Sequence, residues 1–139
     1  MRRIFVDTSA FIACTDQADQ FNKDALDLLR LLIDSRLLQV TTNYVLAEAY
    51  TRIRRKLGHQ ATVKFSDGIR KLVEKRELQV IYVDAALDKM AWEIFKKYAD
   101  QDFSFVDCAS FAWLRQHPEC EVFAFDDDFL WIGFTPFQG

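Results

Sequence analysis

The order of hydrophobic and polar residues along the chain predicts strands that alternate with helices. Short, continuous apolar runs are typical of strands that are buried on both faces of a parallel sheet. Runs of this kind predict strands at residues 3–6, 37–41, 78–83 and 122–125. The first and last of these are followed directly by an aspartate.

Between the strands, apolar residues recur at helical spacing, and capping residues mark the helix ends. We expect Asn43 to be the N-cap of a helix that runs to about Leu57 and stops at Gly58. The remaining helices are expected from near Ser9, at 20–35, 60–75, 85–98 and 105–116, with a helical turn at 128–131.

This alternation indicates an α/β domain with a central parallel sheet. The chain has 139 residues, half of them hydrophobic, with only four Gly and two Pro. It therefore fits one domain over residues 1–139, with little room for linkers. No segment approaches the roughly 20 apolar residues that cross a bilayer, so we expect no membrane association.

Four carboxylates occupy unusual places in this pattern. Asp7 and Asp126 end apolar strands, whereas Glu48 and Asp107 interrupt apolar helices. An ionised side chain near a core is costly unless something pairs with it. In parallel sheets, ligands bind beyond the carboxyl ends of the strands, where Asp7 and Asp126 are expected. The four acids together therefore suggest one shared partner, and a divalent cation is the obvious candidate.

Two of the acids have simpler explanations as helix caps. Asp7 could cap the helix that follows it, although Thr8 and Ser9 offer alternative caps. Asp107 stands three residues after Ser104, which matches a capping box. Capping and metal binding can coexist, because a helix N-terminus favours negative charge.

The other acids also have alternatives. Glu48 could form an i,i+4 surface pair with Arg52, worth only about 0.3–0.5 kcal/mol. The apolar residues around Glu48 instead favour a side chain that looks into a polar cleft. In the acidic run 126–128, Asp126 is the best candidate to face the strand ends, and Asp128 is the next.

Several carboxylates within about 4–6 Å would repel one another and raise each other's pKa, unless a cation is bound. Hard oxygen ligands suit Mg²⁺ or Mn²⁺. Zinc is disfavoured, because Cys14, Cys108 and Cys120 and the two histidines lack zinc-ligand spacing. The odd number of cysteines, without a disulfide framework, favours a reducing cytosol, so we expect a cytoplasmic protein.

The basic residues are unevenly distributed. The net charge is -3, yet nine of the 18 basic residues fall within residues 52–76. A solvated helical face is the simplest explanation. A basic patch beside an acidic pocket also suits a polyanionic substrate, whose phosphates are the expected ligands of Arg52, Arg54, Arg55 and Lys56.

At these residues the sequence resembles the PIN-domain family of metal-dependent ribonucleases, particularly the VapC-type toxins of prokaryotic toxin–antitoxin pairs. The resemblance covers nearly the whole chain, and the order and spacing of its motifs agree. The motifs lie at residues 4–12, 41–48, 102–110 and 125–129.

The resemblance implies a three-layer α/β/α domain and an Mg²⁺- or Mn²⁺-dependent endoribonuclease that leaves a 5′-phosphate and a 3′-hydroxyl. On this reading Asp7 and Asp107 hold the principal metal, and Asp126 either completes its shell or helps to bind a second ion. Glu48 either binds the metal through water or positions the attacking water. Asp128 is a fifth candidate ligand. Thr8 or Ser9 would orient water or ligands at the substrate.

VapC-type relatives usually form homodimers and are inhibited by a small antitoxin, so the resemblance implies both partners beside an RNA substrate. The alternative is a non-catalytic PIN-like module that binds RNA or protein. A receiver domain would need a second acid adjacent to Asp7, and a haloacid-dehalogenase-type phosphatase would need an acid at Ser9. Trp92 and Trp131 could serve the dimer or the antitoxin interface if they are exposed, but we expect them to be core or half-buried packing residues.

Overall fold

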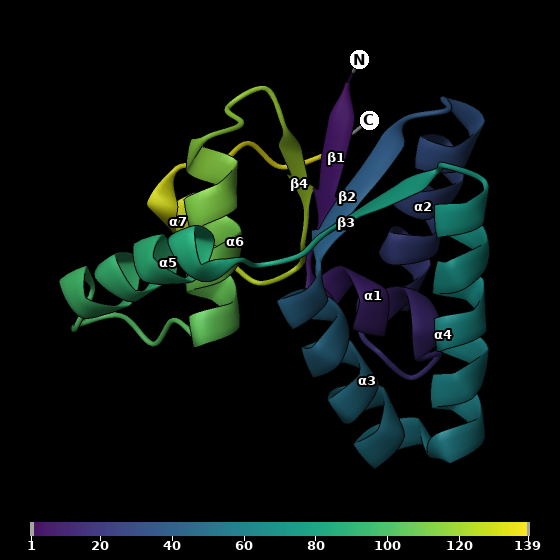
Figure 1. The fold of residues 1–139 in the computed structure, drawn as a ribbon. Coiled ribbons are helices and arrows are strands. Elements are labelled where there is room, and N and C mark those ends of the chain that lie inside the picture. Colours follow the sequence, from purple (N-terminus) through teal and green to yellow (C-terminus); the bar gives the residue numbers. More distant parts are fainter. Residues whose placement is uncertain (1, 139) are drawn as a thin grey trace.

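The centre of the computed structural model, which describes residues 2–138, is a four-stranded sheet whose pairings are all parallel (Figure 1). The strand order is β3-β2-β1-β4. The strands are β1 (Arg3–Val6), β2 (Leu38–Thr42), β3 (Leu78–Ile81) and β4 (Glu121–Phe123). The predicted strands are confirmed, although β3 ends two residues earlier than expected and β4 lies slightly nearer the N-terminus.

The described part of the chain has seven helices, of which α1 to α6 connect the strands and α7 follows β4. They lie on both sides of the sheet, with α2 and α4 on one side and α5, α6 and α7 on the other (Figure 1). The predicted three-layer α/β/α architecture is therefore confirmed. The helices are α1 (Thr8–Thr15), α2 (Asn22–Asp34), α3 (Asn43–Leu57), α4 (His59–Glu74), α5 (Ala85–Lys97), α6 (Phe105–Arg115) and α7 (Asp128–Ile132).

The chain order places a topological switch point between β1 and β4. From β1 the chain moves outward through β2 to β3, and it then returns past β1 to form β4. In an open parallel sheet, the crevice at such a switch point is the usual ligand site. Asp7 follows β1 directly, and its backbone N–H donates to the Phe123 carbonyl of β4 at 3.0 Å.

The N-cap of α3 differs from the prediction. Thr42, the last residue of β2, accepts a hydrogen bond from the Val45 N–H at 3.1 Å. Asn43 is already helical, and its Oδ1 instead accepts from the Val83 N–H at 2.8 Å. The expectation of Asn43 as N-cap was wrong because β2 runs one residue further than predicted. Gly58, at φ 96°, ends α3 as expected.

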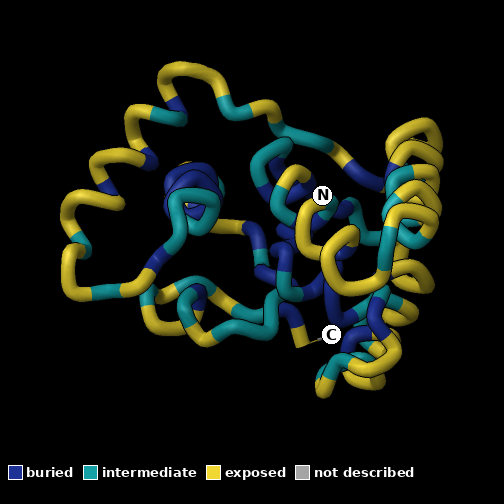
Figure 2. Tube along the Cα trace, turned by 90° about the horizontal axis from the view of Figure 1, so that it is seen from below, coloured by how far each residue is buried: buried dark blue, intermediate teal, exposed yellow. Residues whose placement is uncertain are grey.

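The aromatic core holds α6 rigidly against the sheet. Phe5, Phe111 and Phe123 are fully buried, and the rings of Phe5 and Trp113 lie 5.7 Å apart. Figure 2 shows the tube dark blue through most of α6, whereas α5 is largely exposed. The rigid packing of α6 fixes the position of any side chain on its first turn.

Two tryptophans pack only partly against the rest of the domain. Trp92 on α5 is 48% exposed and Trp131 on α7 is 56% exposed. Trp92 contacts Phe95, and Trp131 contacts Tyr98 and Phe103. The expectation of half-buried packing is confirmed, and neither side chain belongs to the core. No helix within residues 2–138 has the length and apolar character needed to cross a membrane.

Candidate metal centre

Asp7 connects the end of β1 to the start of α1. It is the N-cap of α1, and its Oδ2 accepts from the Ser9 N–H at 3.2 Å and from the Ser9 hydroxyl at 2.8 Å. The side chain is buried, with only 2% exposed. Its other oxygen, Oδ1, has no hydrogen-bond partner among the described residues. The capping role is thus real, and it leaves one buried carboxylate oxygen unused.

Asp107 lies on the first turn of α6 and, like Asp7, caps a helix with one carboxylate oxygen and leaves the other free. It forms the predicted capping box with Ser104: the Asp107 N–H donates to Ser104 Oγ at 3.0 Å, and Asp107 Oδ2 accepts from the Ser104 N–H at 3.1 Å. The box fixes the orientation of the side chain with one oxygen. The second oxygen remains available to the strand-end crevice.

Asp126 follows β4 on the loop that leads to α7. Its Oδ1 accepts from the Asp128 N–H at 3.1 Å, which again uses one of its two oxygens. Phe21 stacks on the neighbouring Phe125, with ring centroids 4.9 Å apart, and this contact ties the loop to the segment before α2. The loop that carries Asp126 is therefore anchored by packing as well as by hydrogen bonds.

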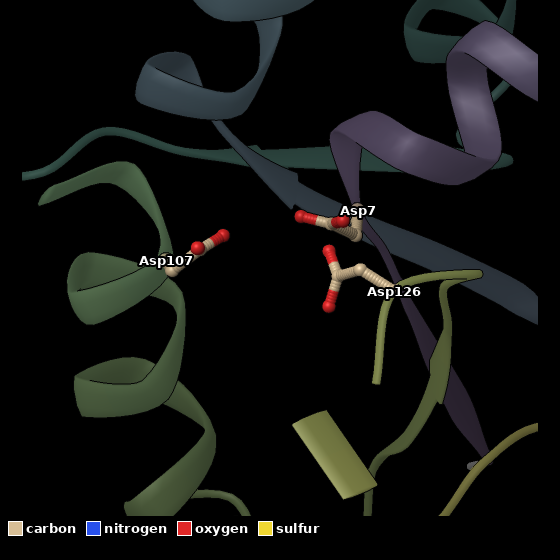
Figure 3. Close-up of side chains that lie close together, drawn as sticks. All are labelled: Asp7, Asp107 and Asp126. Atoms are coloured by element: carbon tan, nitrogen blue, oxygen red, sulfur yellow. The ribbon is translucent and has the colours of Figure 1, made fainter. Parts of the chain in front are cut away.

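These three aspartates converge on one point. Asp7, Asp107 and Asp126 each offer an oxygen atom that lies within 4.8 Å of the others. Figure 3 shows Asp107 reaching from α6 toward Asp7, with Asp126 beside Asp7. We refer to the three residues as the aspartate cluster. Asp7 lies 100 or more positions before the other two in the sequence, so only the fold brings the three together.

The electrostatics of the aspartate cluster are unfavourable when no cation is bound. Burial, followed by repulsion from Asp126 and Asp107, raises the pKa of Asp7 well above its usual range, against hydrogen bonds from Ser9. Burial also raises the pKa of Asp107 to about 6, with Asp126 adding to the effect. Carboxylates held together in this way ionise readily only beside a positive charge.

The donor set fits a hard divalent cation. It offers three carboxylates, and the unpartnered Asp7 Oδ1 is a buried acceptor that lacks a donor. Mg²⁺ and Mn²⁺ prefer oxygen ligands of this kind and commonly keep several waters in addition to one or two carboxylates. The residues present therefore match the predicted Mg²⁺ or Mn²⁺.

Comparison with known proteins assigns the chain to a family. The family model of the PIN domain matches residues 4–134, which include all three members of the aspartate cluster. The chain belongs to the PIN domain family. The recognition made from the sequence motifs is thereby confirmed.

This PIN domain is similar to VapC proteins over almost its full length. It is 36% identical over 132 residues, 95% of each chain, to the 23S rRNA-specific endonuclease VapC20 from two strains of Mycobacterium tuberculosis. The crystal structure of M. tuberculosis VapC20, described as a sarcin–ricin loop cleaving toxin, matches with a TM-score of 0.82 and 31% identity, covering 98% of this chain and 99% of that one.

A more distant structure shares the fold alone. DNA-bound VapBC from Salmonella typhimurium matches with a TM-score of 0.68 at 12% identity, covering 99% of this chain and 98% of that one. The architecture of the PIN domain is thus retained even where few residues are identical.

Glu48 lies outside the group of oxygens that the fold brings together. It is half-buried on α3, one turn after Tyr44. The alternative surface pair with Arg52 is absent from the ion pairs of residues 2–138. Its role as a fourth catalytic acid therefore stays a prediction. Asp128 is nearer the cluster: burial and repulsion from Asp126 raise its pKa.

The hydroxyl residues after Asp7 differ from each other. Ser9 Oγ donates to Asp7 Oδ2 at 2.8 Å and accepts from the Phe125 N–H at 2.9 Å, so it connects two arms of the aspartate cluster. Thr8 is buried, and its hydroxyl has no hydrogen-bond partner among the described residues. The predicted contact of Thr8 or Ser9 with substrate remains untested.

The basic residues at the end of α3 separate into two groups. Arg52, Arg54 and Arg55 are exposed, as a phosphate contact requires. Lys56 Nζ instead pairs with Asp16 Oδ2 at 2.8 Å, which joins α3 to the end of α1. Sequence reasoning missed Asp16, a buried acid that also accepts from the Ala18 N–H. Its position after an apolar helix was the available signal.

Proposed function

We propose that this PIN domain is an Mg²⁺- or Mn²⁺-dependent endoribonuclease and the toxin of a type II toxin–antitoxin pair. The observation that carries the proposal is the aspartate cluster, where three carboxylates from β1, α6 and the β4–α7 loop meet at the switch point of the sheet. The similarity of the whole chain to VapC20 supports RNA as the substrate.

The residues of the cluster would hold the cation and orient the scissile phosphate. When bound, the cation supplies positive charge for the phosphate oxygens and lowers the pKa of a coordinated water. The capping bonds of Asp7 and Asp107 keep each carboxylate in one orientation, so little rearrangement is needed on binding. Ser9 holds the Asp7 arm and the Asp126 loop at a fixed separation.

Two further acids complete the proposed site. Glu48 would act through water, since it is half-buried on the neighbouring face of α3. Asp128 would serve as an additional ligand, since it lies close enough to Asp126 for their charges to interact. Arg52, Arg54 and Arg55 would bind RNA phosphates and contribute affinity without sequence information, whereas Lys56 is engaged with Asp16.

A small antitoxin and a second copy of the chain are the proposed protein partners, and the cytoplasm is the proposed location. An apolar groove of about 710 Å³ supports a protein partner. It runs between α1, α2 and α4, and its lining includes Phe11, Leu29 and Phe65. A hydrophobic groove between helices is the kind of surface that receives an amphipathic helix.

The experiment that tests the nuclease activity uses end-labelled RNA with Mn²⁺ or with EDTA, and sarcin–ricin loop RNA is the first substrate to try. We expect cleavage with Mn²⁺ only, with products that carry a 5′-phosphate and a 3′-hydroxyl. Cyclic phosphate ends, or equal cleavage in EDTA, would contradict the proposed chemistry. Intact RNA across a panel, together with tight RNA or protein binding, would favour the non-catalytic binding module.

A further inference from the structure

An exposed aromatic surface lies on α5, which packs against α6, the helix that carries Asp107. Trp92 is 48% exposed and Phe95 is 40% exposed. Their rings stack on each other, with centroids 5.4 Å apart and planes inclined by 13°. We call these two residues the α5 aromatic pair. Neighbouring large aromatic side chains that remain exposed in this way are a common mark of a binding surface.

The α5 aromatic pair is connected to the aspartate cluster by Phe105, the first residue of α6. The Phe105 ring lies 6.3 Å from Trp92, 6.1 Å from Phe95 and 6.3 Å from Tyr44 of α3. Asp107 follows Phe105 by two residues, so the two side chains share the first turn of α6 but leave it in different directions. A continuous aromatic wall therefore leads from the α5 surface to the helical turn that also carries Asp107.

A hydrogen bond between helices sets the direction in which this wall faces. Tyr44 Oη donates to Asp88 Oδ1 at 2.9 Å, which ties α5 to the start of α3. Asp88, Trp92 and Phe95 are spaced at about one helical turn, so they share one face of α5. The buried face of α5 is formed by Leu87, Ala91 and Ile94.

Two exposed lysines flank the α5 aromatic pair and can contact phosphates. Lys89 and Lys96 are exposed and lie about one turn before and after Trp92. Lys96 pairs with Glu93 at 3.4 Å, but both side chains are exposed, so the pair is weak and a phosphate can replace it. The other acid on this face, Asp88, is already hydrogen-bonded to Tyr44.

We propose that the α5 aromatic pair stacks on an unpaired base of the RNA substrate, next to the phosphodiester held at the aspartate cluster. This inference rests on the proposed function for its substrate class. Exposed aromatic rings beside cationic side chains are the usual means of holding single-stranded nucleotides, because every base has a face that can stack. Bases inside a duplex are already stacked, so the surface selects loops and unpaired ends.

The test measures the fluorescence of Trp92 in a protein that leaves RNA intact. The Asp7→Asn change serves this purpose, and Trp131→Phe removes the other exposed tryptophan, while Trp113 is buried. A short single-stranded oligoribonucleotide should quench the emission of Trp92, whereas an abasic oligomer of equal length should not. In the Asp7→Asn protein, Trp92→Ala should weaken RNA binding about tenfold, and Trp92→Phe should retain most of the affinity.

Trp131 provides the matched control, because it is also half-exposed but packs on Tyr98 and Phe103 instead of Phe105. Trp131→Ala should leave RNA affinity unchanged. Equal quenching by the abasic oligomer, or unchanged affinity after Trp92→Ala, overturns the proposal. A second copy of this chain is the other possible occupant of the surface, and sedimentation velocity tests it. If Trp92→Ala only converts a dimer to a monomer, the surface is a self-association interface and the proposal fails.

The outcome is separable from that of the nuclease assay. Base-dependent quenching in a protein that never cleaves RNA would support the stacking surface and refute the nuclease. Metal-dependent cleavage with an unchanged KM after Trp92→Ala would have the opposite meaning, because it would support the nuclease and refute the stacking surface.

Discussion

The hydroxyl of Ser9 lies between Asp7 and the loop that carries Asp126. It donates to Asp7 Oδ2 at 2.8 Å and accepts from the Phe125 N–H at 2.9 Å, a contact between residues 116 positions apart. One small side chain thus sets the separation of two members of the aspartate cluster. Ser9 is therefore placed to act on the proposed metal site as a positioning residue, through Asp7 and the loop that carries Asp126.

We predict that Ser9→Ala lowers both stability and activity. The change leaves the Phe125 N–H without its acceptor, at a cost of about 1–3 kcal/mol, and removes one of the two hydrogen bonds that orient Asp7. Urea unfolding and the Mn²⁺ concentration for half-maximal cleavage measure the two effects. Ser35→Ala, at an exposed helix end on α2, is the control. A Ser9→Ala protein with an unchanged Mn²⁺ requirement would remove Ser9 from the site.

The pattern of the sequence was sufficient for the elements, because burial and periodicity are local signals. It also singled out Asp7, Asp107 and Asp126, which the fold brings together, whereas the role of Glu48 stays a prediction. Asn43 was misplaced as a cap since the end of β2 depends on pairing with β3, which the local sequence does not encode. The sequence pattern also could not predict the contact of Ser9 with Phe125 or the pairing of Lys56 with Asp16. Both join residues that are distant in sequence, and only the packed structure determines them.

We predict that Asp7→Asn stabilises the metal-free protein. The buried carboxylate of Asp7 is held beside Asp107 and Asp126, and a neutral amide removes that repulsion. The melting temperature in EDTA should therefore rise. Mn²⁺ at about 100 times its Kd should stabilise the original protein by about 2.7 kcal/mol, but should stabilise the variant far less.

The exposed Asp34→Asn change on α2 is the control for this pair of melting curves. It alters the net charge equally and should change neither curve. A lower melting temperature of the Asp7→Asn protein in EDTA would contradict the prediction. It would show that the Asp7 carboxylate stabilises the metal-free protein as a helix cap by more than its repulsion from Asp107 and Asp126 destabilises it.

The stability of the metal-free protein should decrease as the pH rises. Burial and neighbouring carboxylates raise the folded-state pKa of Asp107 to about 6, above its value in the unfolded chain. The folded state therefore binds this proton more tightly, and the stabilisation is complete below about pH 4 and lost as the pH rises through about 6. For this partly buried group, the loss should be about 1–2 kcal/mol.

Chemical unfolding in EDTA at several pH values measures this slope, and Asp107→Asn should flatten it. Protons and the cation compete for the same oxygens, so Mn²⁺ affinity should increase over the same pH range. The assigned direction of the Asp107 pKa shift would be contradicted if the metal-free protein became more stable between pH 5 and 7, roughly the range where Asp107 titrates.

Charge reversal at Arg52 and Arg55 should weaken RNA binding without affecting the metal. Both side chains are exposed on α3, and loss of two phosphate contacts should reduce the salt dependence of binding by about 1–2 units of slope. Filter binding across a salt series measures this, and Mn²⁺-induced stabilisation should be unchanged. Lys23→Glu on the exposed face of α2 is the control. A loss of RNA affinity in the Lys23→Glu protein equal to that in the Arg52/Arg55 double variant would indicate a non-specific charge effect.

The central claim is that Asp7, Asp107 and Asp126 hold one cation that drives RNA hydrolysis. Its most direct test is the single-turnover cleavage rate of the Asp7→Asn, Asp107→Asn and Asp126→Asn proteins at saturating RNA, with melting curves to confirm folding. We predict that each folded variant loses at least about a hundredfold in rate at Mn²⁺ concentrations that saturate the original protein. A folded variant that cleaves at the original rate would contradict the claim.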